Sequence, residues 1–297
     1  DLRDNPGGFL QIAEQIADEF LEAGKLILFT KNKSDQVIKR YATEKGRFEN
    51  AEVYVLINEN SASASEIVAG ALQDNDKGTI IGRRSFGKGL VQQEMGLGDG
   101  SVIRLTTSRY YTPTGRSIQR SYVSGSEAYY NSYYKRLENR NTDQTDPESV
   151  QDSLKFITPK GKVVYGGGGI IPDIYSPNDP IFNSTLFEFL KGTGVLDFFV
   201  FEQLDKHRGR YSSVPESQFL KEFEITDVIY QQFISYLRAF TDVEVTKAMS
   251  FEAPLKVLLK SAFTKQLFGD IAAAKVLLEI DPILNKVIEL ESLGALD

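Results

Sequence analysis

A short serine-rich segment has the composition and position of a nucleophile turn. Ser61-Ala62-Ser63-Ala64-Ser65-Glu66 follows an apolar run that ends at Ile57 and precedes a helical pattern. A serine at a strand-to-helix turn lies beside free backbone N–H groups, whose partial positive charge favours an oxyanion. The same spacing fits a capping box between Ser63 and Glu66, in which serine only begins the helix. The spacing therefore leaves open which serine, if any, is a nucleophile.

A serine nucleophile needs a base, and the best candidate is a lysine. Lys88 lies in Ser85-Phe86-Gly87-Lys88-Gly89-Leu90, among apolar residues and glycines. Lysine acts as a base only when neutral, and apolar surroundings lower its pKa because desolvation disfavours the charged form. In an extended segment Gln92 shares a face with Lys88, so we expect Gln92 to orient the amine. The alternative is a surface lysine on an edge strand.

Two further observations bear on this chemistry. The Asp4-Asn5-Pro6-Gly7-Gly8 turn exposes backbone donors, so Gly7 or Gly8 is a candidate oxyanion donor, with a plain loop as the alternative. The chain has a single histidine, His207, next to Arg208-Gly209. We interpret it as a solvated loop residue without a catalytic role.

The elements that must position these residues follow an α/β pattern. Apolar residues at helical spacing, including Ile12 and Ile16, predict a helix after Gly8 that stops by Gly24. Short β-branched or aromatic runs predict strands, and a second helix covers the serine segment. The predicted strands span 26–29, 53–57, 79–81, 90–91 and 102–111, and the second helix spans 61–73. Alternation of this kind predicts an α/β core.

The rest of the chain changes character twice. Residues 120–155 are polar with scattered tyrosines and are interpreted as a surface insertion, and Gly166 to Gly169 indicate a hinge or a close backbone approach. From about Pro180 the pattern is helical, with caps expected at Thr226 and Ser250 and a helix start or kink at Pro282. We therefore predict two domains, a core over 1–179 and a helical subdomain over 180–297.

Composition excludes several function classes. The 297 residues carry a net charge of −7, from 34 basic and 41 acidic residues, and include no cysteine. Thiol nucleophiles, thiolate metal sites and disulfides are excluded, and no basic cluster favours nucleic acid. No apolar run has membrane-spanning length.

We expect no cofactor, no metal, no nucleic-acid partner and no transmembrane segment. Because the chain opens with Asp1 in a turn-rich stretch, we expect it to be a fragment.

Several motifs, in order, resemble the C-terminal processing (tail-specific) protease family. They are Leu-Arg-Asp-Asn-Pro-Gly-Gly from Leu2, the serine segment continuing to Asp74, Gly82 to Gln92, Ser101 to Gln119, and Gly168 to Asp173. The resemblance spans about residues 1–177. It implies an α/β fold with a ββα spiral core of the Clp protease/crotonase type, preceded in the family by a PDZ domain that is absent here.

The resemblance also implies a site and an activity. The family's serine endopeptidases use a Ser-Lys dyad assisted by Gln, which here correspond to Ser63, Lys88 and Gln92. The oxyanion hole corresponds to the N–H groups of Ala64 and of the Gly7-Gly8 turn. The implied partners are protein or peptide substrates, approached through their C-terminal regions, and the implied location is the periplasm or cell envelope. The family uses no cofactor.

Two other functions compete with this interpretation. One is a non-catalytic binding or scaffold module that uses the helical C-terminal region. The other is a crotonase-like acyl-thioester enzyme, which shares the core fold and does not require the Ser63 and Lys88 combination.

Overall fold

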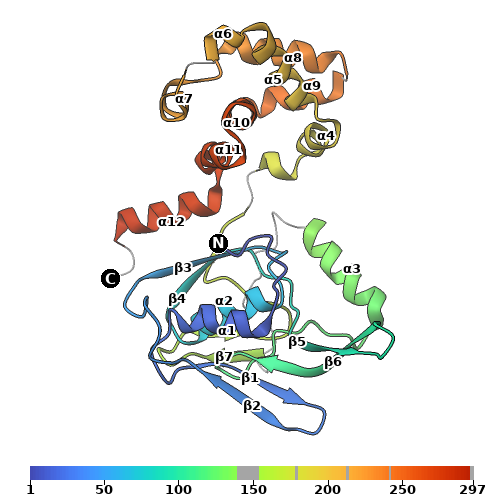
Figure 1. Cartoon of the computed structure of the whole chain (residues 1–297), viewed down its shortest axis with the longest axis vertical. Coiled ribbons are helices and arrows are strands. Elements are labelled where there is room, and N and C mark those ends of the chain that lie inside the picture. The colour runs from blue at the N-terminus through green and yellow to red at the C-terminus, as the bar shows by residue number, and fades with distance from the viewer. Residues whose placement is uncertain (139–153, 178–179, 212–213, 241, 295–297) are drawn as a thin grey trace. The chain divides into compact units, whose positions relative to one another are not determined.

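The chain folds into two compact units, Asp1–Pro177 and Asn178–Asp297 (Figure 1). The structure is a computed structural model and describes residues 1–138, 154–177, 180–211, 214–240 and 242–294. Each unit is described by itself.

The N-terminal unit is mixed α/β, which confirms the predicted class. Its helices are α1 (Leu10–Asp18), α2 (Ala64–Asp74) and α3 (Gly125–Glu138). Its strands are β1 (Leu26–Asn32), β2 (Val37–Tyr41), β3 (Val53–Ile57), β4 (Gly78–Gly82), β5 (Leu90–Gly96), β6 (Val102–Tyr111), β7 (Lys155–Ile157), β8 (Val163–Tyr165) and β9 (Ile174–Tyr175).

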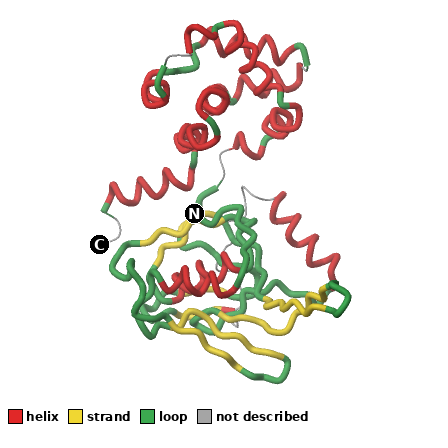
Figure 2. The backbone as a smooth tube through the Cα atoms, in the orientation of Figure 1, coloured by secondary structure: helices red, strands yellow, loops and turns green. Residues whose placement is uncertain are grey.

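The strands of this unit form three sheets (Figure 2). One has four antiparallel strands in the order β2-β1-β6-β5, and β7 pairs with β8 in a hairpin. The third is parallel, in the order β3-β4-β9, with Val53 opposite Gly78 and Ile57 opposite Gly82. Parallel neighbours need a crossover connection, and α2 provides it between β3 and β4.

Helix α2 is the centre of the N-terminal core. All of its residues are buried, and it contacts α1, β1 and β4. Small residues allow this close packing, since a Cβ on Gly70 would lie 2.8 Å from a Thr112 methyl carbon. Full burial of each larger side chain, such as Ile67 and Leu72, stabilises the fold by about 1.5–3 kcal/mol. The serine segment is thus attached to the most constrained helix of the unit.

The structure departs from the predicted elements in several respects. Helix α1 buries Ala13 and Ala17, whereas Ile12 and Ile16 stay exposed. Strand β2 was not predicted, because all of its residues are exposed and it lacks the burial alternation that marks a strand. Helix α3 occupies part of the predicted insertion. The rest of that insertion, 139–153, lies outside the described residues.

The C-terminal unit is helical. Its α-helices are α4 (Thr185–Thr193), α5 (Val195–Lys206), α6 (Arg208–Tyr211), α7 (Glu216–Glu222), α8 (Asp227–Arg238), α9 (Asp242–Ser250), α10 (Glu252–Phe268), α11 (Asp270–Leu277) and α12 (Pro282–Leu293), with 3₁₀ turns η3 (Pro180–Asn183) and η4 (Leu278–Ile280). Their core is rich in aromatic and leucine side chains, including Phe199, Phe233, Leu255 and Phe263.

The helix caps and helix start predicted from the sequence of the C-terminal unit are confirmed in part. Thr226 caps α8 by accepting from Ile229 N–H, and Pro282 begins α12, so both predictions are confirmed. Ser250 is not a cap, because it is the last residue of α9. The N-cap residue of α10 is Phe251. His207 is the exposed C-cap of α5.

A buried ion pair fixes the end of α2. Arg116 Nη2 lies 2.7 Å from Asp74 Oδ1, and both side chains are fully buried. The other oxygen of Asp74 accepts from the Thr114 amide at 3.0 Å and from its hydroxyl at 2.6 Å. Both oxygens of the Asp74 carboxylate therefore accept hydrogen bonds inside the core.

Replacing Asp74 with asparagine is expected to lower the free energy of unfolding by about 3–5 kcal/mol, because it leaves the Arg116 charge buried without its partner. Urea unfolding measures this effect. The matched control is Asp99→Asn at an exposed turn, where we expect a change within about 0.5 kcal/mol. Equal effects of the two substitutions would show that the pair contributes no net stability.

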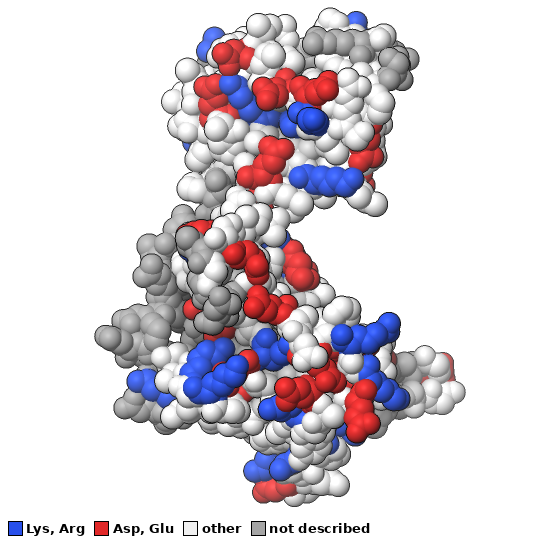
Figure 3. Space-filling model, turned by 90° about the vertical axis from the view of Figure 1, so that its left-hand side faces the viewer, with Lys and Arg blue, Asp and Glu red and all other residues white. Residues whose placement is uncertain are grey.

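Charges are mixed on the surface. In the view of Figure 3, basic and acidic side chains are interspersed on each unit, without a broad area of one sign. None of the helices that the structure describes combines the length and apolar character needed to span a bilayer. Within the same residues, no cluster of three or more histidines and carboxylates forms a potential metal site.

Candidate active site

The serine turn, residues 58–63 between β3 and α2, holds Ser63 in an unusual conformation. Ser63 has φ 56° and ψ −114°, a region that costs about 1–3 kcal/mol for a residue with a side chain. Its N–H donates to Glu66 Oε2 at 2.9 Å, within the predicted capping box, and its carbonyl accepts from Tyr110 Oη at 3.2 Å. These contacts keep the strained residue in place.

The hydroxyl groups of the other two serines of the segment, Ser61 and Ser65, make structural hydrogen bonds. Ser61 Oγ donates to the Leu2 carbonyl at 2.7 Å, and Ser65 Oγ donates to the Asn5 carbonyl at 3.0 Å. Both serines are buried, with 0% and 3% of their surface exposed, whereas Ser63 is partly exposed. The flanking serines therefore fasten the N-terminal segment to the turn, and Ser63 lines the pocket described below.

The glycine turn, residues 4–9, is pressed against the serine turn. Asn5 O accepts from the Ala62 amide at 3.0 Å, and Gly7 has φ 89°. A Cβ on Gly7 would lie 2.5 Å from Ala62 O and 2.6 Å from the Ala64 nitrogen, whereas a Cβ on Gly8 would meet nothing within 4 Å. Gly7 must therefore be glycine for two independent reasons, its backbone angle and its neighbours.

Replacing Gly7 with alanine is expected to lower the free energy of unfolding by about 1–3 kcal/mol. Alanine is strained at this positive φ, and its Cβ would overlap the backbone of Ala62 and Ala64. Thermal melting of Gly7→Ala against Gly8→Ala measures it. We expect Gly8→Ala to change stability by less than about 0.5 kcal/mol. Equal melting temperatures for the two variants would contradict the close approach.

The lysine loop, residues 83–89 between β4 and β5, has little regular structure and is held by contacts from several directions. Phe86 N–H donates to Ser61 O at 2.9 Å, and Ser85 N–H donates to Ile170 O at 3.0 Å. The predicted close approach of the glycine run is confirmed here, since a Cβ on Gly169 would lie 2.4 Å from Ser85 O. The loop leaves Lys88 half-buried at its end.

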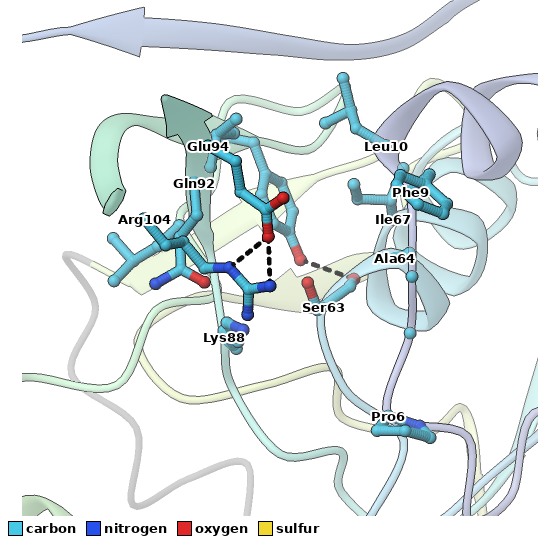
Figure 4. Close-up of a pocket in the computed structure, with 15 residues that line it drawn as sticks. Pro6, Phe9, Leu10, Ser63, Ala64, Ile67, Lys88, Gln92, Glu94 and Arg104 are labelled. Atoms are coloured by element: carbon cyan, nitrogen blue, oxygen red, sulfur yellow. Dashed lines mark hydrogen bonds and ion pairs between the residues drawn. The ribbon is translucent and has the colours of Figure 1, made fainter. Parts of the chain in front are cut away.

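A pocket of about 540 Å³ collects all the predicted site residues (Figure 4). Its lining includes Ser63, Ala64, Lys88, Gln92 and the Gly7-Gly8 turn. A register irregularity between Val91 and Gln92 interrupts the β5–β6 pairing there, and both residues line the pocket. Gln92 itself is exposed.

Hydrogen bonding among these groups is incomplete. Among the described residues, no hydrogen bond joins Ser63 Oγ to Lys88 Nζ, or Lys88 to Gln92. The Gly7 amide is already used, because it donates to Asn5 Oδ1 at 2.9 Å. For the amides of Gly8 and Ala64 the described part of the chain supplies no acceptor. Catalytic hydrogen bonds often tighten only when substrate is bound.

Two buried groups at the pocket, Glu66 behind its lining and Tyr110 within it, have shifted pKa values. Burial raises the pKa of Glu66, although hydrogen bonds from Ser85, Lys88, Gly87 and Ser63 oppose that rise. Burial, and then the nearby Glu66 carboxylate, raise the pKa of Tyr110 well above its ordinary value. Tyr110 is therefore a neutral donor, as its bond to the Ser63 carbonyl requires.

Three polar side chains that line the pocket were not predicted from the sequence. Tyr110 comes from β6, and Glu94 and Arg104 form an ion pair across β5 and β6 that reaches over the pocket in Figure 4. The pair was detectable in principle, since opposite charges on adjacent strands suggest cross-strand partners. Tyr110 gave no such signal, because its contact with Ser63 joins residues 47 positions apart.

Comparisons with known proteins match the two units to different families. Residues 1–126 match the model of peptidase family S41, and residues 186–269 match a family of unknown function, DUF8443. A carboxy-terminal-processing protease of Bartonella bacilliformis is 50% identical over 119 residues, covering 40% of this chain and 27% of the relative. The chloroplastic carboxyl-terminal-processing peptidase 1 of Arabidopsis thaliana is 40% identical over 118 residues, covering 40% and 24%.

Among solved structures, the photosystem II D1 C-terminal processing protease matches with 35% identity and a TM-score of 0.38, covering 40% of this chain and 31% of that one. The chain spans about a quarter of the length of the two curated relatives described above. The resemblance inferred from the motifs is confirmed: residues 1–126 match the model of peptidase family S41 and are similar in sequence to the carboxy-terminal-processing proteases.

Proposed function

We propose that the N-terminal unit is the catalytic region of a serine endopeptidase of the C-terminal processing type. The observation that carries the proposal is the single pocket shared by Ser63, Lys88, Gln92 and the Gly7-Gly8 turn. These residues come from segments separated along the sequence, and a nucleophile, a base and backbone donors are the parts that acyl transfer requires.

In the proposed mechanism, neutral Lys88 takes the Ser63 hydroxyl proton while Oγ forms a bond to a peptide carbonyl carbon. The carbonyl oxygen becomes an oxyanion, for which Ala64 N–H and Gly8 N–H are the available donors. The C–N bond then breaks, and the Lys88 ammonium gives its proton to the leaving amine. Water attacks the acyl-enzyme, losing a proton to Lys88, and the acid is released as Ser63 is reprotonated. Gln92 assists by orienting the amine.

The remaining assignments of the proposal rest on the family resemblance. They are a ββα spiral core of the Clp protease/crotonase type in the first domain, substrates bound through their C-terminal regions, and a periplasmic or envelope location. Extracytoplasmic placement agrees with the bacterial, cyanobacterial and chloroplast origins of the relatives.

A covalent probe tests the proposal directly. Incubation with a fluorophosphonate is expected to add one phosphonyl group to Ser63, located by mass spectrometry of the digested chain. Ser65→Ala is the matched control and should still be labelled, because Ser65 is buried behind the turn. Label on another serine, or none, would overturn the proposal. A stable partner captured by an unlabelled chain would favour a binding module, and thioester turnover would favour a crotonase-like enzyme.

A further inference from the structure

The carboxylate of Glu66 joins the two sides of the pocket from behind. Glu66 lies in the first turn of α2 and is fully buried. Its Oε2 accepts from Ser63 N–H at 2.9 Å and also from Lys88 N–H at 2.8 Å. One oxygen atom therefore contacts the backbone of both residues to which the reaction has been assigned.

The second oxygen fastens the lysine loop to the same side chain. Glu66 Oε1 accepts from Ser85 Oγ at 2.5 Å and from Gly87 N–H at 2.7 Å. The loop has no helix or sheet to define the position of Lys88, and Ser63 is held in a strained conformation. All four donors are neutral, so the carboxylate holds them by hydrogen bonds to a charged acceptor, which are stronger than neutral ones.

We propose that Glu66 is a positioning residue, which sets the separation and orientation of Ser63 and Lys88 by binding both backbones through one carboxylate. This inference rests on the proposed function. It gives Glu66 a role beyond that of a helix cap, because Gly87 and Lys88 lie outside the capped helix. It also explains why the Ser63 amide is not an oxyanion donor, since Glu66 already occupies it.

Glu66→Gln is the sharpest test. A carboxamide has one acceptor oxygen, and its NH₂ group must face at least one of the backbone N–H donors, which then loses its acceptor. Because misplacement of reacting groups by about 1 Å costs about 10²-fold in rate, we expect kcat to fall by about 10²-fold. We expect KM to change by less than about threefold, since Glu66 does not line the pocket.

A second variant separates geometry from charge. Glu66→Asp keeps the negative charge but withdraws the carboxylate by one methylene, so it no longer reaches both backbones. We expect kcat to fall here as well. Full activity in Glu66→Asp would overturn the proposal, because charge alone would then suffice.

The matched control for loss of a buried carboxylate is Asp74→Asn. Asp74 is fully buried, pairs with Arg116 at 2.7 Å, and lies outside the pocket lining, the serine turn and the lysine loop. It should lower the melting temperature without the selective loss of kcat. An equal loss of kcat in Asp74→Asn and Glu66→Gln would assign the effect to general destabilisation and overturn the proposal.

A readout independent of catalysis completes the test. In ¹⁵N–¹H spectra of the whole chain, the amide resonances of Ser63 and Lys88 should shift together in Glu66→Gln and stay in place in Asp74→Asn. Shifted amides with unchanged kcat, or unshifted amides, overturn the inference alone. A parent chain that a fluorophosphonate does not label at Ser63 overturns the proposed function, and the catalytic role of Glu66 with it.

Discussion

Replacing Ser63 with alanine is expected to lower the rate of peptide-bond cleavage by at least about 10³-fold, because Ser63 is the one serine among the described residues that lines the pocket. The substitution removes a single oxygen atom. The backbone bonds that hold the turn are made by the Ser63 amide and carbonyl, and both remain in alanine. Loss of activity should therefore occur with little loss of stability.

The measurement is the release of fragments from an unfolded protein substrate, followed at several substrate concentrations, together with the melting temperature of each variant. Ser34→Ala, at the exposed turn between β1 and β2, is the matched control and should cleave at the parent rate. Cleavage by Ser63→Ala at the parent rate would remove Ser63 as nucleophile, whatever its place in the pocket.

Replacing Lys88 with arginine is expected to abolish cleavage to a similar degree, by at least about 10³-fold. A guanidinium keeps its charge throughout the accessible pH range, so it accepts no proton from Ser63. Because the charge is retained, this variant separates a proton-transfer role from a purely electrostatic one. Single-turnover cleavage and the rate of fluorophosphonate labelling both report the step in which the serine proton is removed.

The matched control is Lys39→Arg. Lys39 lies on the exposed strand β2, the position that a lysine without a catalytic role would have. It should leave both rates unchanged. Retained cleavage in Lys88→Arg would show that another group accepts the proton, and it would remove the Ser-Lys dyad while leaving the serine nucleophile intact.

Local patterns were sufficient for much of the fold around the site. Strands β3 and β4 were predicted because each is a short apolar run of the kind found in buried strands, and helix α2 was predicted because apolar residues recur at helical spacing between them. Strand β2 and helix α3 escaped prediction because neither buries a regular face. Ser250 was misassigned because a serine at a junction between two helices fits the end of one and the start of the next.

The sequence by itself determined the residue types available for the chemistry: serines, a lysine among glycines, and a glycine turn, with no cysteine and one remote histidine. Spacing alone did not separate the three serines, and the family resemblance pointed to Ser63. The tertiary structure gave the physical distinction, because the hydroxyls of Ser61 and Ser65 donate to the backbone of the N-terminal segment. The physical reason is the range of the contacts. Periodicity and capping report neighbours within a few residues, whereas Glu66 binds Lys88 across 22 positions, and Ser65 binds Asn5 across 60. Such bonds exist only once sheets and helices have brought distant segments together.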